Sequence, residues 1–273
     1  MTIKLVAFDM DGTFLNDQNT YNHQRFGEIL QQLRAKGIRV VAASGSQYQR
    51  LQDQFDEFKS EMDFVSQNGA AVYSEGQPLL IRAMPEKAVT ATLNAIQQQF
   101  SETDIAEHLV VGVKSAYVDQ TLSQAAYDLT YHYYNHLKRV TDLATVTPER
   151  LQDQITSIGI TFNEHVDFDA KMSDLRQALP TGLSSQTSGY NTELISDTTV
   201  NKAAGLAQLQ SKYDIADDEI MTFGDNENDI SMLKLTPYGY VVANAEDKIK
   251  KQVSHFTESN NDEGVLNVLS RLV

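Results

Sequence analysis

Apolar positions in residues 4–65 alternate between two spacings. Predominantly apolar runs at 4–8 and 38–43, and the start of another at 63–65, are typical of buried strands. The positions between these runs that recur at helical spacing are Phe26, Ile29, Leu30, Leu33, Leu51, Phe55 and Phe58. Strands that alternate with helices predict a parallel sheet with right-handed crossovers.

The middle of the chain breaks this alternation. A hairpin pattern spans residues 70–83, and Pro85 is well placed to begin a helix. Separate strand-like and helix-like segments follow up to about residue 187, and the alternation resumes from Glu193. We therefore expect an α/β fold in which a Rossmann-like parallel-sheet core domain, formed by residues 1–84 and 188–273, carries an inserted α+β cap domain at 85–187.

Composition and charge narrow the class of protein. The 273 residues are 41% hydrophobic and 22% charged, which suits a globular protein with a sizeable core. The net charge of −15 argues against nucleic acid or an anionic membrane as a partner, because both require a basic face. The chain has no cysteine, which excludes disulfides and a Cys nucleophile. The apolar run at 3–8 is too short for a signal peptide or membrane span, so we expect a cytoplasmic protein.

Two carboxylates follow the first predicted strand, in the run Phe8-Asp9-Met10-Asp11-Gly12-Thr13. Ligands of parallel sheets bind at the carboxyl ends of strands. Two like charges there repel, so each needs a cation or a shared proton, and oxygen ligands are those that Mg²⁺ prefers. Asp and Gly are also common in turns, which is the alternative explanation.

A second acidic cluster, Gly224-Asp225-Asn226-Glu227-Asn228-Asp229, follows the apolar strand predicted at 220–223. Asp225 and Asp229 are four residues apart, so both can lie on one side of the following turn. These oxygen donors suit Mg²⁺, although Asp and Asn are also preferred as helix caps. The sequence therefore predicts a magnesium site that draws on two strand ends.

Two further positions are ambiguous on their own. Ser44-Gly45 ends the second predicted strand, where a hydroxyl and a backbone N–H can bind a phosphate oxygen, but such a pair is more often a turn and helix cap. Lys202 begins a predicted helix, where the helix dipole disfavours a cation. That placement suggests an anionic partner, and a solvated lysine is the alternative.

Taken in this order, the four clusters resemble the haloacid dehalogenase superfamily of phosphohydrolases, and the Cof-type subfamily in particular, over the whole chain. The stretches 66–70 and 243–245 also resemble motifs of that family. The resemblance implies a Mg²⁺-dependent phosphatase that hydrolyses small phosphorylated metabolites, such as sugar phosphates. It gives no indication of the substrate's identity or of the oligomeric state.

The resemblance also implies roles for the site residues. Asp9 would be the nucleophile that forms an aspartyl-phosphate, and Asp11 would act as general acid and then base. The implied magnesium ligands are Asp9, the Asp11 carbonyl and Asp225, with Asp229 in support. The residues implied to bind the phosphoryl group are Ser44, Gly45, Lys202 and Asn228. An insertion of this kind opens and closes on hinges, which we expect near residues 82–85 and 186–191, at Pro85 and Ser188-Gly189.

Two departures from the family pattern matter. Ser46 stands where the family usually has Arg, which predicts weak binding of highly charged phosphates, with a KM of about 1 mM or more. Arg50, one turn further on, is expected on a helix surface. Ala203 follows Lys202 in place of the usual Gly, which is a minor change.

Other functions remain open at this stage. One is a phosphotransferase or phosphomutase on the same scaffold, and another is a receiver-like regulatory module that is itself phosphorylated. The position of Asp9 after the first strand favours an enzyme, and Asp11 argues against a dehalogenase. The polar residues of the insertion that show no recognisable specificity code are Tyr117, His132, Tyr133, Tyr134 and His136.

Overall fold

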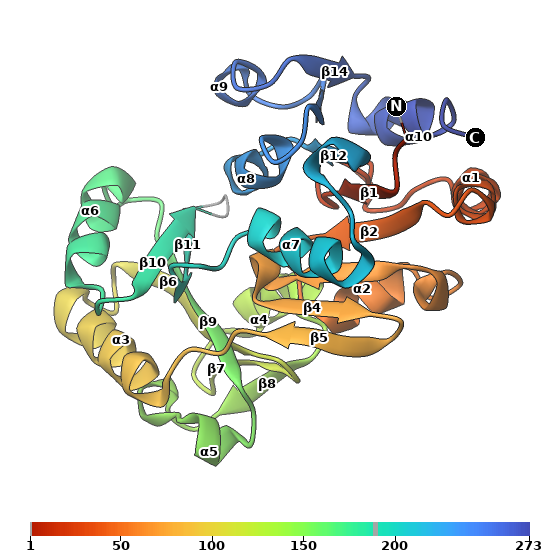
Figure 1. Ribbon diagram of the computed structural model, residues 1–273. Helices are drawn as coiled ribbons and strands as arrows, with labels where there is room; N and C mark the ends of the chain where they lie inside the picture. The colour runs from red at the N-terminus through yellow and green to blue at the C-terminus, as the bar shows by residue number, and fades with distance from the viewer. Residues whose placement is uncertain (1, 188–190) are drawn as a thin grey trace. The chain divides into compact units, whose positions relative to one another are not determined.

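The computed structural model describes residues 2–187 and 191–273, which form two compact units. The core unit comprises Met1–Gly45, Leu51–Leu80 and Asn201–Val273. The inserted unit comprises Ile81–Val200 together with Ser46–Arg50. Figure 1 shows the red and blue ends of the chain side by side in the core unit, where strand β1 lies next to β12. Both ends of the chain thus contribute to the core unit.

The core unit is built on an eight-stranded sheet. In sheet order its strands are β14 (His255–Thr257), β13 (Tyr238–Val242), β12 (Ile220–Gly224), β1 (Leu5–Phe8), β2 (Arg39–Ala43), β3 (Asp63–Ser66), β4 (Ala71–Ser74) and β5 (Gln77–Ile81). The strands from β14 to β3 pair in parallel, and β4 pairs with β3 in the antiparallel sense. The predicted parallel α/β sheet is therefore confirmed.

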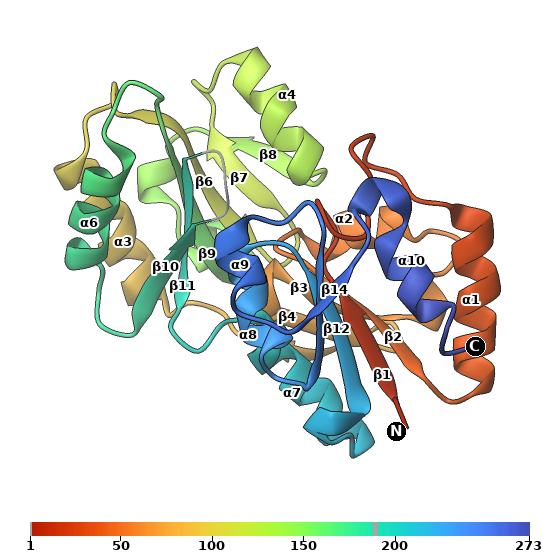
Figure 2. The same ribbon diagram turned by 90° about the horizontal axis from the view of Figure 1, so that it is seen from above.

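Helices cover both faces of this sheet. They are α1 (His23–Ala35), α2 (Tyr48–Gln54), α7 (Lys202–Tyr213), α8 (Ile230–Leu233), α9 (Asp247–Lys250) and α10 (Gly264–Leu269). Figure 2 shows the pair α1 and α10 on the opposite side of β1 and β12 from the pair α7 and α8. Side chains alternate along β1 accordingly: Leu5 and Ala7 pack with Leu206 of α7, whereas the Phe8 ring meets Phe26 of α1. Each central strand is thus buried on both faces, which explains the continuous apolar runs in the sequence.

The inserted unit has its own six-stranded sheet. In sheet order its strands are β10 (Leu183–Thr187), β11 (Thr192–Asp197), β9 (Ile155–Phe162), β6 (Ile105–Gly112), β7 (Ala116–Asp119) and β8 (Leu137–Val140). The helices of this unit are α3 (Glu86–Gln99), α4 (Gln124–Tyr133), α5 (Pro148–Leu151) and α6 (Phe168–Ala178). Residues of α3 and α6 share one apolar cluster with β9, and α4 packs against a second cluster around Leu109 and Val118.

The return boundary of the insertion differs from the sequence-based expectation of residue 187. Strand β11 belongs to the second sheet, because Leu194 pairs with Gly159 of β9, and the inserted unit continues to Val200. An alternating apolar pattern cannot show which sheet a strand joins. Pro85 precedes helix α3, whereas Ser188 and Gly189, expected at the second hinge, lie outside the described residues.

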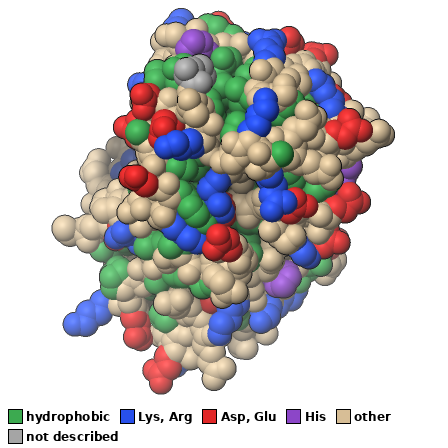
Figure 3. Space-filling view, turned by 45° about the vertical axis from the view of Figure 1, so that its right-hand side comes forward, with side chains coloured by type: hydrophobic (Ala, Val, Ile, Leu, Met, Phe, Trp, Pro, Cys, Tyr) green, Lys and Arg blue, Asp and Glu red, His purple; other side chains and the backbone are tan. Residues whose placement is uncertain are grey.

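Charged side chains of both signs lie on the face of the molecule that Figure 3 shows. On the face drawn in Figure 3, Lys and Arg side chains are interspersed with Asp and Glu. Among the described residues, no helix is both long enough and apolar enough to cross a membrane.

Candidate active site

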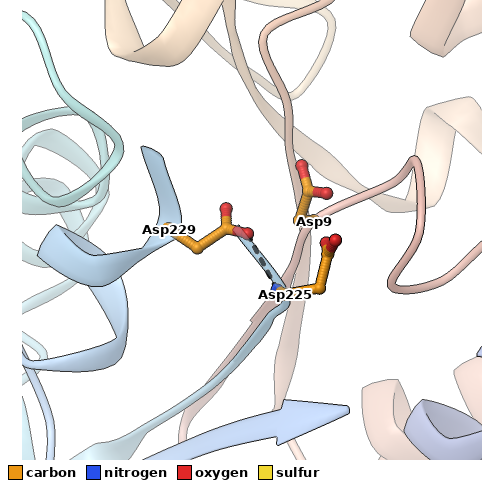
Figure 4. A group of neighbouring side chains, drawn as sticks. All are labelled: Asp9, Asp225 and Asp229. Carbon is orange, nitrogen blue, oxygen red and sulfur yellow. Dashed lines mark hydrogen bonds between the residues drawn. The ribbon is translucent and has the colours of Figure 1, made fainter. Parts of the chain in front are cut away.

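Three acidic side chains meet at the carboxyl ends of two neighbouring strands. Asp9 follows β1, while Asp225 and Asp229 follow β12. Because Phe8 pairs with Phe223 and the Asp9 N–H donates to the Phe223 carbonyl at 3.0 Å, the two strand ends are in register. Figure 4 shows the three carboxylates pointing toward one another, and one oxygen from each lies within 4.8 Å of the others. Parallel pairing therefore assembles the acidic cluster that the sequence predicted.

Lys202 supplies a positive charge to this cluster. It is the first residue of α7 and is fully buried. Its Nζ donates to Asp9 Oδ1 and, at 2.6 Å, to Asp229 Oδ1. The structure excludes the solvated alternative for this lysine. Three carboxylates against one ammonium leave two negative charges when all are ionised, which a divalent cation would balance.

Burial and mutual repulsion change the ionisation of these groups. Burial, followed by the charge of Asp229, raises the pKa of Asp9 well above its ordinary value, although Lys202 opposes the change. Burial likewise raises the pKa of Asp225 to about 6, with Asp229 adding to it and the Thr13 hydroxyl opposing it. For Lys202, burial disfavours the charge, but Asp229 and Asp9 outweigh burial and raise its pKa. A bound cation would favour the ionised form of both aspartates.

Asp229 has a different environment from the other two carboxylates. Its Oδ1 accepts the Lys202 bond, and its Oδ2 accepts the backbone N–H groups of Asp225 and Asn226, each at 3.0 Å. Gly224 makes room for it, since a Cβ there would lie 2.5 Å from the Asp229 Cβ. Asp229 therefore fixes both the turn that carries Asp225 and the ammonium that faces Asp9. This geometry suits a supporting residue.

The loop after β1 reaches the same cluster through Thr13. The Thr13 hydroxyl donates to Asp225 Oδ1 at 2.6 Å. Gly12, with φ of +80°, allows this approach, because a Cβ there would lie 2.8 Å from Asp225 Oδ2. The role of Thr13 could not be predicted from the Asp-Gly-Thr run in which it stands. Asp11 lies on this loop, and its carboxylate is not part of the group of three.

A second polar group joins the other predicted phosphate-binding residues. The Ser44 carbonyl accepts the Asn68 N–H at 3.0 Å, and the Asn228 side chain donates to Asn68 Oδ1 at 3.0 Å. Gly45 lies against the same amide, since a Cβ there would be 3.3 Å from Asn68 Oδ1. Asn68 thus connects Ser44, Gly45 and Asn228. Asn68 lies in the stretch 66–70 that resembles a family motif, but the sequence alone indicated no role for it.

This second group lies next to the first turn of α7. Gly69, in the turn that carries Asn68, has φ of +99° and packs so closely that a Cβ would lie 2.2 Å from the Asn201 carbonyl oxygen. Asn201 caps α7 by accepting the Ala204 N–H at 2.9 Å, and Lys202 follows directly. The fold therefore brings all four sequence clusters to one edge of the core sheet.

Arg50 is buried, so its expected position on a helix surface is wrong. Its guanidinium donates to the Ser46 hydroxyl at 2.5 Å, and only 5% of Arg50 and 7% of Ser46 is exposed. Arg50 also lies over the Tyr133 ring, 5.6 Å from its centroid. A guanidinium is therefore present beside Ser46 although the sequence has no arginine at that position.

Known proteins match this chain over almost its whole length. Residues 6–269 match the family model of haloacid dehalogenase-like hydrolases. The chain is 33% identical over its whole length to the 5-amino-6-(5-phospho-D-ribitylamino)uracil phosphatase YbjI of Escherichia coli, of which it covers 97%. It is 25% identical to YitU of Bacillus subtilis, a phosphatase named for the same substrate, over 97% of this chain and 96% of that protein. The crystal structure of SMU.1108c from Streptococcus mutans UA159 has a TM-score of 0.89 and 27% identity, with 99% of both chains covered.

Proposed function

The chain belongs to the haloacid dehalogenase-like hydrolases and is a phosphatase of small phosphate monoesters, and we propose that it works with Mg²⁺ through an aspartyl-phosphate intermediate. The observation that carries this proposal is the group of Asp9, Asp225 and Asp229 around Lys202. Three carboxylates with one ammonium form an anionic site, yet the substrate is itself an anion. A divalent cation resolves this conflict.

The donor set fits magnesium. Asp9 and Asp225 offer carboxylate oxygens at one strand edge, and the family resemblance adds the Asp11 carbonyl. Asp229 supports these ligands through its bonds to Lys202 and to the Asp225 N–H. When bound, the cation would neutralise charge on the transferring phosphoryl group.

Asp9 is the proposed nucleophile. Lys202 holds one of its oxygens, which orients the carboxylate at the end of β1. Attack on phosphorus by this carboxylate breaks the ester bond and gives an aspartyl-phosphate, which a water molecule then hydrolyses. Asp11, two residues further on, gives a proton to the leaving alcohol and later takes one from the water.

The phosphoryl oxygens require donors that are already in place. The proposed donors are the Ser44 hydroxyl, the Gly45 N–H, the Asn228 amide and the Lys202 ammonium. Asn68 holds the first three together, and Asp229 holds the fourth. Donors that are fixed before the reaction stabilise developing charge without further reorganisation.

The names of the relatives suggest which substrate to test first. Identity to the Escherichia coli protein extends over the whole chain, including the inserted unit. We therefore propose a phosphorylated polyol or sugar-like metabolite as substrate, with 5-amino-6-(5-phospho-D-ribitylamino)uracil as the leading candidate.

The test is hydrolysis of a panel that contains this compound, several sugar phosphates and 4-nitrophenyl phosphate, with Mg²⁺ or with EDTA. We expect activity only with Mg²⁺. Asp9→Asn keeps the side-chain shape but removes the nucleophilic charge, so kcat should fall on the order of 10⁴-fold or more. Asp218→Asn, at the other end of β12, is the matched control and should retain normal turnover. Near-normal turnover by Asp9→Asn with Mg²⁺ still bound would rule out the mechanism.

A further inference from the structure

Two asparagines from the C-terminal part of the core unit hold the loop that follows β1. We call Asn244 and Asn260 the asparagine clasp. Asn244 comes two residues after β13, and Asn260 comes three residues after β14. Both strands are parallel to β12, and β12 to β1, so their carboxyl ends share the sheet edge with Asp9.

The clasp forms a continuous hydrogen-bonded connection along the loop. The Asn244 side chain donates to the Gly12 carbonyl at 2.7 Å, and its Oδ1 accepts the Asn260 backbone N–H at 3.0 Å. The Asn260 side chain then donates to the Leu15 carbonyl at 3.0 Å and to Asp17 Oδ1 at 3.1 Å. Two side chains thus hold both ends of the segment that carries Thr13.

Internal bonds fix the shape of this segment but not its position. The N–H groups of Thr13, Phe14 and Leu15 all donate to the Met10 carbonyl, at 3.3, 3.0 and 2.9 Å. The loop does not pack fully against the C-terminal segment, because a cavity of about 70 Å³ lies between the loop and that segment. Thr13, Phe14 and Asn260 line this cavity. The bonds that fix the loop relative to β13 and β14 are therefore those of the clasp, together with two exposed bonds between Asn261 and Asp17 at the far end of the loop.

A correct loop position matters because the loop contributes to the metal site. Thr13 donates to Asp225, and the close approach of Gly12 to Asp225 leaves no room for a shift in that direction. Asp11 lies between Met10 and Gly12, next to the carbonyl that Asn244 holds. A displacement of about 1 Å in a reacting group can cost on the order of 10²-fold in rate.

We propose that Asn244 and Asn260 are positioning residues, which keep Asp11 and Thr13 in place relative to Asp9 and Asp225. The inference rests on the proposed role of Asp11. Asparagine suits position 244 because one planar amide donates and accepts at once, and it suits position 260 because its NH₂ group donates to two acceptors. Asn260 is 5% exposed and must donate to two acceptors, so an aspartate there would place a carboxylate against Asp17 and the Leu15 carbonyl.

The test compares Asn244→Ala and Asn260→Ala with Asn267→Ala. Asn267 lies in α10 and donates to the Asp262 carbonyl, so it has no bond to the loop. For both clasp variants we expect kcat on 4-nitrophenyl phosphate to fall about 10- to 100-fold with KM nearly unchanged, because the phosphate-binding residues keep their places. Calorimetric Mg²⁺ affinity should fall, and amide hydrogen exchange at residues 10–17 should accelerate. Asn267→Ala should change none of these.

A second variant separates the two bonds of Asn244. Asn244→Asp keeps the acceptor for the Asn260 N–H but loses the donor to the Gly12 carbonyl, so it should resemble Asn244→Ala. Asn244 is exposed, and we expect these variants to fold. Unchanged kcat, Mg²⁺ affinity and hydrogen exchange in Asn244→Ala and Asn260→Ala would overturn the proposal, as would equal losses in Asn267→Ala. Metal binding and hydrogen exchange need no turnover, so a wild-type protein without phosphatase activity would refute the proposed function and still leave the clasp testable.

Discussion

The core unit and the inserted unit differ in the surroundings of their buried carboxylates. In the core unit, Asp9 and Asp229 share one buried lysine, and Asp225 lies beside them. In the inserted unit, the buried Asp153 stands alone and is surrounded by neutral donors. These are the N–H groups of Lys114, Ser115 and Gln154 and the hydroxyl of Tyr117, at 2.8–3.1 Å.

Two other titratable groups are buried in the inserted unit. Burial raises the pKa of Glu193, whose Oε1 accepts the Thr187 hydroxyl bond at 2.5 Å and whose Oε2 lies 3.6 Å from the Arg176 guanidinium. Burial lowers the pKa of His108 to about 4, which keeps the imidazole neutral. A lone buried group is thus satisfied by local donors or loses its charge. Among these buried groups of the described residues, the cluster of the core unit alone brings several like charges together, and that excess is the basis of our proposal that it binds a cation and an anionic substrate.

Removing the buried ammonium should give the largest effect. Lys202→Met leaves Asp9 and Asp229 without their shared partner, so we expect the metal-free protein to lose about 3–5 kcal/mol of unfolding free energy. Urea denaturation measures this loss, and turnover should disappear as well. The control is Lys171→Met, which breaks a partly exposed pair with Asp104 in the inserted unit and should cost far less. Equal losses of unfolding free energy in the two variants would show that the buried lysine of the core unit is no more important to stability than the partly exposed one.

Replacing the isolated Asp153 carboxylate should lower the stability of the protein but leave its catalytic rate nearly unchanged. Asp153→Asn turns an acceptor into an amide that cannot accept from all of its present donors, at a cost of about 1–3 kcal/mol. We expect kcat on 4-nitrophenyl phosphate to remain within a few-fold of wild type, since Asp153 lies in the inserted unit. A collapse of kcat in a variant that circular dichroism shows to be folded would assign Asp153 a role that we do not infer.

The smallest expected effect is on the pH dependence of stability, to which a group in each unit contributes with opposite sign. The pKa of Asp225 rises from 3.8 to about 6 on folding, so its contribution to metal-free stability is present below pH 4 and is lost as pH rises through 6. Mg²⁺ stabilises the ionised form, so the increase in Tm that Mg²⁺ causes should be larger at pH 7 than at pH 5. His108 acts in the other direction, because its contribution is present above pH 6.5 and is lost as pH falls toward 4. A Tm increase that does not change with pH would contradict the assignment of Asp225 as a metal ligand.

The sequence predicted the acidic cluster because strand ends are local features. Apolar runs locate β1 and β12, and the polar residues that follow them must lie at the carboxyl ends. The sequence could not show that Lys202 is buried, since burial depends on how α7 packs on the sheet. It also could not place β11, because strands of either sheet have the same apolar pattern.

Arg50 shows a further limit of reasoning from motif positions. The absence of an arginine at position 46 suggested a missing cation, but a guanidinium one helical turn away already bonds the Ser46 hydroxyl. The predicted rise in KM therefore no longer follows from the sequence. A Ser46→Arg substitution would bring two guanidinium groups together at a buried position.

The central claim is that Asp9 becomes covalently phosphorylated during turnover. The most direct measurement is to stop the reaction of wild-type protein, Mg²⁺ and a substrate with borohydride, which reduces an aspartyl-phosphate to homoserine. Peptide mass spectrometry then locates the modified residue. We predict homoserine at position 9 in samples with Mg²⁺ and substrate, and none in samples that lack either. Turnover without any modification at Asp9, or with modification at Asp11 or Asp225 instead, would contradict the account.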